Sequence, residues 1–122
     1  MLSITKLFRF SASHQLYNHN GKCHRLHGHS YLLEITIEGR RKINDTRAPD
    51  YGMIMDFGKL KKIVNDHVID KLDHSHLNDF VFTPTAENLT FWIANQLYAH
   101  IDGLKRVRLW EEMGSACCTW ES

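Results

Sequence analysis

The residues best suited to chemistry are three histidines in the first quarter of the chain, His14, His27 and His29. Side chains alternate between the two faces of a β-strand, so His27 and His29 would point the same way. His14 ends another alternating segment, residues 8–14. If the two segments pair, three imidazoles converge, and three protein nitrogens with one open position are typical of a catalytic zinc. The alternative is a set of solvated histidines, since an isolated His-x-His pair is a weak signal.

Cys23 lies four residues before His27 and is the second candidate. A thiolate is favoured near cations or a metal, where it can act as a nucleophile or a general base. The alternative is a small buried apolar residue. Gly28 separates the two histidines. A glycine in a strand indicates either a close approach of backbone or ligand, or a β-bulge.

The third candidate is the pair Asp73 and His74, in a polar segment. A carboxylate that orients an imidazole suits a proton relay. The alternative is a turn with surface histidines, and His76 competes with His74 for the role.

The fourth candidate is Glu111, at the end of an alternating segment that contains Val107 and Leu109. At the rim of a sheet, its carboxylate could accept two hydrogen bonds from the amino and ring N–H groups of a ligand. Alternation predicts that Glu112 faces the other way and is solvated.

The pattern of apolar residues predicts the strands and helices that would position these candidates. Alternation predicts strands over residues 2–14, 28–39, 107–111 and 116–120. Apolar residues with helical spacing predict a helix over about 57–71, capped by Asp56, and a second over about 86–101, capped by Thr85. Residues 15–26, 40–52 and 72–83 are polar and are expected to form connections.

Length and composition indicate one soluble domain over residues 1–122. A net charge of +1 gives no reason to expect nucleic acid or a membrane surface as a partner. The nine histidines are many for this length and favour metal chemistry. The three cysteines form no paired framework, and the N-terminus lacks the apolar core of a signal peptide, so a cytoplasmic protein is expected.

The predicted order of elements is strand, strand, helix, helix, strand, strand. This order favours an α+β fold, with a four-stranded antiparallel sheet and two helices on one face. Such a sheet has two open edges, which native proteins rarely leave bare. Edge-to-edge assembly of several copies into a barrel would close them, so a homo-oligomer is expected.

The chain resembles the 6-pyruvoyl-tetrahydropterin synthase family over almost its whole length. Within the family it is most similar to the queuosine-pathway branch, which forms a 6-carboxy product. Six motifs occur in the family's order, and together they are highly specific. They are residues 10–14, 23–29, 55–57, 72–78 and 84–88 and the strand that ends in Glu111.

The resemblance implies the tunnelling fold, in which subunits form a barrel, often as a hexamer of two trimers. It implies Zn²⁺ on the three histidines named above, Cys23 as general base, Asp73 and His74 as partners in proton transfer, and Glu111 as the anchor of the pterin ring. Since the family's active site lies between subunits, Asp73 and His74 would serve a neighbouring copy. The implied substrate is 7,8-dihydroneopterin triphosphate, converted to 6-carboxy-5,6,7,8-tetrahydropterin, acetaldehyde and triphosphate.

Alternative functions differ in product or in chemistry. The pyruvoyl-forming synthase would share the same residues, and a non-catalytic zinc- or pterin-binding module would need only some of them. An aldolase acting on dihydroneopterin is more distant, because that reaction does not need three histidines. Glu112 stands where the family usually has threonine. Cys23 stands where a folate-type subgroup has glutamate, which disfavours that subgroup.

Overall fold

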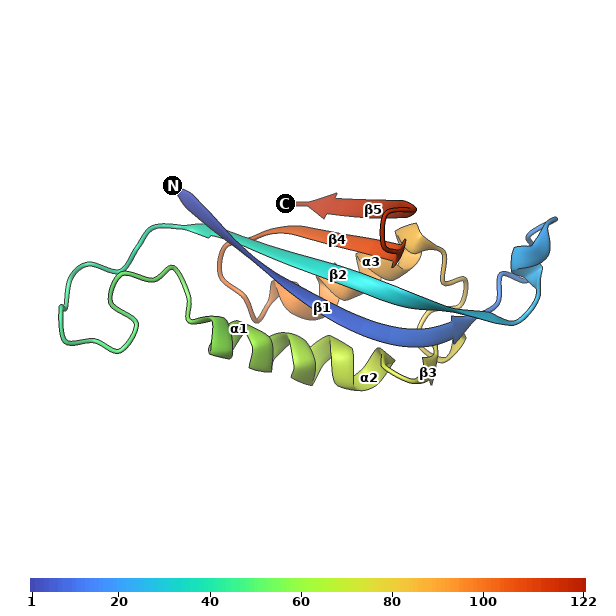
Figure 1. Ribbon diagram of the computed structural model, residues 1–122, viewed down its shortest axis with the longest axis horizontal. Helices are drawn as coiled ribbons and strands as arrows, with labels where there is room; N and C mark the ends of the chain where they lie inside the picture. Colours follow the sequence, from blue (N-terminus) through green and yellow to red (C-terminus); the bar gives the residue numbers. More distant parts are fainter.

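A single five-stranded sheet organises the chain, which a computed structural model describes from residue 1 to residue 122. The strands are β1 (Leu2–His14), β2 (His27–Gly39), β3 (Ser75–His76), β4 (Leu104–Glu112) and β5 (Ala116–Glu121). Their order across the sheet is β3-β1-β2-β4-β5. The α+β fold is confirmed, and Figure 1 shows the α1–α2 segment below β1 and α3 behind β2 and β4.

The β1–β2 pair is the longest part of the sheet, with 13 residues in each strand. The strands are antiparallel, and their register places His14 opposite His27 and Ala12 opposite His29. Even-numbered residues of β1 and odd-numbered residues of β2 therefore share a face of the sheet. The connection between them, which contains the short 3₁₀-helix η1 (Lys22–His24), projects beyond the end of the sheet (Figure 1).

The expectation of four antiparallel strands was incomplete. β3 runs parallel to β1 and pairs Ser75 with Ala12 and His76 with Ser13. The sheet is therefore mixed, although its four long strands are antiparallel as predicted. A two-residue strand has no detectable period in the sequence, because its pairing is decided by the long-range contact with β1. Beyond this contact, the outer edge of β1 from Leu2 to Ser11 has no strand partner.

Both predicted helices form, with different internal structure. The first comprises α1 (Phe57–Val64), a π-helical turn η2 (Asn65–Ile69) and α2 (Asp70–Leu72), close to the predicted 57–71. The second, α3 (Ala86–Tyr98), ends three residues before the predicted 101. The Asp56 and Thr85 side chains accept hydrogen bonds from the main-chain N–H groups of Lys59 and Asn88, as N-caps do. Neither helix is long and apolar enough to cross a membrane.

The hydrophobic core lies between the helices and one face of the sheet. β1 and β2 contribute one side of each strand, including Phe10 and Leu33, and the helices contribute residues such as Leu60 and Ile93. The opposite face of the sheet carries polar cross-strand contacts, such as that between the Thr5 and Thr36 hydroxyls. The three candidate histidines have the parity of the core residues, so they continue the core face to the end of the sheet.

Candidate metal centre and its surroundings

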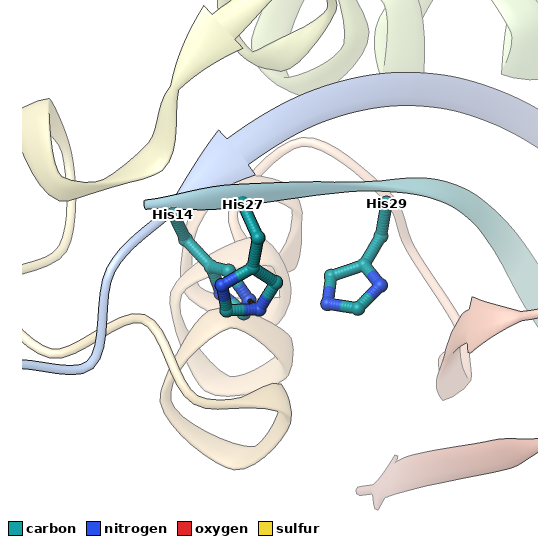
Figure 2. A group of neighbouring side chains, drawn as sticks. All are labelled: His14, His27 and His29. Atoms are coloured by element: carbon teal, nitrogen blue, oxygen red, sulfur yellow. Dashed lines mark hydrogen bonds between the residues drawn. The ribbon is translucent and has the colours of Figure 1, made fainter. Parts of the chain in front are cut away.

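The three histidines converge as predicted. His14 is the last residue of β1, and His27 and His29 begin β2, so their side chains lie on one face at one end of the sheet (Figure 2). One potential ligand atom from each lies within 4.8 Å of the other two. His14 is buried, whereas His27 and His29 are partly exposed. The hairpin register alone produces this convergence, because His14 and His27 are direct partners across the strands.

Main-chain carbonyl groups orient two of the three rings. His14 donates its Nδ1–H to the Pro84 carbonyl over 2.9 Å, and His27 donates its Nδ1–H to the Arg25 carbonyl over 2.7 Å. A carbonyl can only accept, so in the neutral rings both Nε2 atoms carry lone pairs. These two atoms face each other at 2.9 Å. Two acceptors at this distance require a proton or a metal cation between them, and the donor set therefore fits a bound metal.

Distances and protonation agree with this interpretation. Tetrahedral zinc with Zn–N bonds of about 2.0–2.1 Å separates its nitrogen ligands by about 3.3 Å, so a small outward movement of the two rings would admit the ion. Burial lowers the pKa of His14 below its usual value, against the raising effect of the hydrogen bond to Pro84. The buried imidazole is thus held in the neutral form that can ligate a metal.

Glu111 lies beside the cluster, on the predicted face. Its Oε2 is 3.8 Å from His29 Nε2. The Tyr31 hydroxyl, buried below the histidines, lies 3.5 Å from His14 Nδ1. Burial, and to a lesser extent the charge of Glu111, raise the pKa of Tyr31 far above its usual value. Tyr31 was not predicted as part of the site, although its position two residues after His29 on the same strand face is a signal that could have revealed it.

Glu112 is solvated as predicted, with 64% of its side chain exposed, but the prediction that it faces away from the site was wrong. The register between β4 and β5 shifts between Trp110 and Glu112, which is a β-bulge. A bulge breaks the alternation of side chains and redirects them. As a result Glu112 Oε1 lies 3.5 Å from His29 Nδ1, so both acidic side chains approach the same imidazole.

Cys23 lies in η1, at the tip of the β1–β2 connection, and its thiol is partly buried. Its main-chain carbonyl accepts a hydrogen bond from Leu16 N–H over 2.9 Å, which closes the connection. The thiol itself makes no hydrogen bond within the chain. The structure thus places Cys23 in the segment that joins the ligand-bearing strands, without bringing it into the histidine cluster.

Asp73 and His74 form a separate pair at the outer edge of β1. Asp73 Oδ2 is 3.1 Å from His74 Nδ1, and Asp73 Oδ1 accepts a hydrogen bond from Ser11 N–H. This bond to Ser11, and then the contact with His74, lower the pKa of Asp73. His74 has φ = 60°, an uncommon conformation for a residue with a side chain, and its ring is 84% exposed. The pair is therefore presented to solvent and makes no contact with the three histidines.

Residues 76–84 hold the end of β1 in place, a role that was not predicted from the sequence. His76 Nδ1 bonds the Ser13 hydroxyl over 3.0 Å. The Asn78 side chain bonds both the N–H and the carbonyl group of Gln15. With the bond from His14 to Pro84, these contacts fix the residues on both sides of the first ligand. The Asn78 and Pro84 motifs of the sequence thus have a structural role beside the histidine cluster.

Comparisons with known proteins agree with this geometry. The sequence profile described as 6-pyruvoyl tetrahydropterin synthase matches residues 3–122. A 6-carboxy-5,6,7,8-tetrahydropterin synthase of Synechocystis sp. is 40% identical over 119 residues, which cover 95% of this chain and 91% of the relative. A dihydroneopterin monophosphate aldolase of Pyrococcus furiosus is 43% identical over 89 residues, covering 70% of each chain.

Among solved structures, the 6-pyruvoyl tetrahydropterin synthase of Caenorhabditis elegans is similar to this fold. The TM-score is 0.83 at 25% sequence identity, and the match covers 99% of this chain and 95% of that one. The agreement over the whole chain includes the sheet, both helical segments and the connections between them.

Proposed function

The chain belongs to the 6-pyruvoyl tetrahydropterin synthase family, and on that premise we propose that it converts 7,8-dihydroneopterin triphosphate and one water molecule into 6-carboxy-5,6,7,8-tetrahydropterin, acetaldehyde and triphosphate, as in queuosine biosynthesis. The observation that carries the proposal is the pair of Nε2 lone pairs, from His14 and His27, facing each other beside His29. A site that needs a cation between its imidazoles suits a metal-dependent lyase.

His14, His27 and His29 would hold the metal, which we propose is Zn²⁺. Bound zinc with an open position polarises substrate oxygens and stabilises negative charge that develops on them. The protein's contribution is to keep His14 neutral by burial and to fix the ring orientations through the Pro84 and Arg25 carbonyls.

Cys23 is proposed as the base that removes a carbon-bound proton from the substrate side chain. Its thiol makes no hydrogen bond within the chain, and it stands on the connection between the two ligand-bearing strands. A short rearrangement of this connection would bring the thiol toward a substrate held at the histidines. A base placed on a loop beside a rigid sheet is a common arrangement for catalytic groups.

Asp73 and His74 are proposed to transfer a second proton. The Asp73 carboxylate holds His74 Nδ1, which leaves Nε2 of the exposed ring free to exchange a proton with substrate. Unusual backbone conformations concentrate at functional sites, and the positive φ of His74 agrees with such a role. Because the pair faces outward, we propose that it serves the metal centre of a neighbouring copy in a homo-oligomer.

Glu111 is proposed to anchor the pterin. Its carboxylate, on the core face beside the histidines, can accept two hydrogen bonds from the amino and ring N–H groups of a pterin. No redox cofactor is required, because reduction of the ring is balanced by oxidation of the side chain within the same molecule. Three free cysteines are consistent with the proposed cytoplasmic location.

A second candidate function is aldol cleavage of a dihydroneopterin phosphate. The similarity to the Pyrococcus furiosus aldolase favours it, since that relative is 43% identical over 70% of both chains. The 6-pyruvoyl synthase reaction is the third, through the similarity to the Caenorhabditis elegans structure. The pyruvoyl synthase would use the same cluster, and the three reactions would differ in which bond of the side chain is broken.

Identification of the product tests these alternatives in one experiment. Purified zinc-loaded protein is incubated with 7,8-dihydroneopterin triphosphate, or with the monophosphate, and the pterin is identified by mass spectrometry. The proposed lyase yields 6-carboxytetrahydropterin and acetaldehyde. A 6-pyruvoyl or a 6-hydroxymethyl product would replace the proposal with the synthase or the aldolase, respectively. No turnover with zinc bound would favour a binding module.

A further inference from the structure

The three proposed ligands are not oriented in the same way. The Nδ1–H groups of His14 and His27 are each donated to a main-chain carbonyl, at 2.9 Å and 2.7 Å. The Nδ1 atom of His29 is buried but has no hydrogen-bond partner. It is the one buried side-chain polar atom in the structure that is left unpaired. Buried polar groups in native proteins are almost always paired, so this atom calls for a partner.

The ring of His29 has a defined orientation toward the cluster. Figure 2 shows one of its nitrogens directed at the other two imidazoles and the second on the far side of the ring. The contacts of Glu111 with Nε2 and of Glu112 with Nδ1 are on different sides of the ring. An imidazole that binds a metal through one nitrogen nearly always donates the other N–H to a carboxylate or carbonyl.

The group in position to accept from His29 Nδ1 is the Glu112 carboxylate. Its Oε1 lies 3.5 Å from the nitrogen, slightly beyond a hydrogen bond, and the side chain is 64% exposed. An exposed side chain is free to rotate, and the approach to about 2.7–2.9 Å that a charge-assisted bond requires is short. The β-bulge between Trp110 and Glu112 interrupts the alternation of side chains just before this carboxylate.

We propose that Glu112 is a positioning residue of the metal centre, which accepts the Nδ1–H of His29 and thereby fixes Nε2 toward the metal. Two adjacent acids then have separate tasks: Glu112 orients a ligand, and Glu111 remains available for substrate. The inference rests on the metal-binding part of the proposed function. It does not depend on which pterin is the product.

Metal affinity provides the test. Glu112→Ala, Glu112→Gln and Glu121→Ala proteins are titrated with Zn²⁺ in competition with a chromophoric chelator. Loss of an outer-shell partner typically weakens metal binding about 10–100-fold, which is the expected effect of Glu112→Ala. The amide oxygen of Glu112→Gln can still accept from Nδ1, so this variant should lose much less. Glu121, paired with Arg106 on the same hairpin, is the control for loss of one acidic charge and should have no effect.

Three results would overturn the assignment. Glu112→Ala could bind zinc as tightly as Glu121→Ala, which would show that His29 needs no carboxylate. Glu112→Gln could be as weak as Glu112→Ala, which would reduce the role to charge. Wild-type protein could fail to bind zinc, which would remove the metal centre together with this proposal.

A second measurement reports on geometry. In Co²⁺-substituted protein, the visible absorption bands should shift in Glu112→Ala and not in Glu121→Ala; unchanged bands in Glu112→Ala would contradict a positioning role. Glu112→Gln is nearly isosteric and keeps the test valid if the alanine variant is unstable. Failure of the proposed reaction can be distinguished from failure of this inference. If wild-type protein binds zinc tightly but forms no 6-carboxy product, the zinc affinities of the variants can still be compared.

Discussion

His27 is held in the cluster by its hydrogen bond to the Arg25 carbonyl, with Nε2 facing His14. His27→Ala removes one of three proposed ligands, and two imidazoles do not retain zinc firmly. We expect the variant to lose zinc during gel filtration, as measured by elemental analysis of the eluted protein. His67→Ala is the matched control, since His67 stacks on His100 far along the chain from the cluster. One zinc per chain in His27→Ala would refute the ligand assignment.

Cys23 is separate from the histidine cluster within the chain, so its loss should leave the metal in place. Cys23→Ala should bind zinc as wild type does and lose turnover by about 10²–10⁴-fold, the usual contribution of a general base. Zinc content and initial rate are measured on the same preparation. Cys117→Ala, which removes an exposed thiol from β5, should keep full activity. If Cys23→Ala turns over normally, another group is the base.

Asp73 links pH to stability. Its pKa lies below the ordinary 3.8 because the native carboxylate accepts from Ser11 N–H and contacts His74. Above pH 3.8 the carboxylate is ionised in both the folded and the unfolded state, and its stabilisation is complete. As the pH falls below 3.8, the unfolded chain binds a proton first, and the stabilisation is lost once the pH passes the native pKa.

Asp73→Asn should therefore lower the free energy of unfolding at pH 7 by less than about 1 kcal/mol, since a partly exposed ion pair is screened. The difference from wild type should shrink between pH 4 and pH 2, as followed by thermal unfolding. Asp79→Asn, an exposed acid nearby, is the control. A difference that grows as the pH falls would have the wrong sign for a carboxylate with a lowered pKa.

Residue identities predicted the histidine cluster but not the orientation of its rings. The alternation of residues 8–14 and 27–37 was enough to place His14, His27 and His29 on one face. The acceptors of His14 and His27 are carbonyl groups, which every residue has, so no residue type marks them. Glu112 was misplaced because a bulge depends on how β4 pairs with β5, which a single strand's sequence does not reveal.

The α3 helix connects its own stability to the metal centre. Thr85 caps the helix through the Asn88 N–H, and the preceding Pro84 carbonyl holds His14. Thr85→Ala should cost about 1 kcal/mol of unfolding free energy, measured in urea, because one N-terminal N–H loses its acceptor. It should also weaken zinc binding slightly by loosening Pro84.

Thr83→Ala provides the comparison. Its side chain makes no hydrogen bond, and its carbonyl, which accepts from Asn88 Nδ2, is retained in the variant. Equal stability of the Thr83 and Thr85 variants would show that the cap contributes nothing.

Long elements with a regular hydrophobic period were predicted well. Elements whose position depends on contacts with distant residues were not. The buried positions Leu60, Val64 and Val68 follow helical spacing and located the first helix. The π-helical turn over Asn65–Ile69 adds a residue to one turn without disturbing that spacing enough to be visible. β3 has only two residues and exists because β1 offers an edge at Ala12 and Ser13.

At the scale of the whole molecule, a single chain exposes Asp73 and His74 to solvent, and neither belongs to its histidine cluster. If this pair acts on a neighbour's substrate, the active protein is an oligomer. Light scattering after gel filtration should give a multiple of the 14.3 kDa chain mass, with six copies expected from the resemblance to the family. A fully active monomer would contradict the assignment of Asp73 and His74 to a neighbouring copy.

The open edge of β1 and the edge of β5 give each chain two different surfaces for pairing with other copies. Subunits that associate through two different surfaces form either closed rings or open filaments. The rotation between successive subunits decides which of the two forms. That rotation depends on the bend of the sheet, and β-bulges increase bend and twist. The bulge beside Glu112 lies in β4, next to the β5 edge, so copy number and the orientation of His29 would share one structural cause if the chain assembles through its sheet edges. A variant that straightened this bulge would be expected to alter both together.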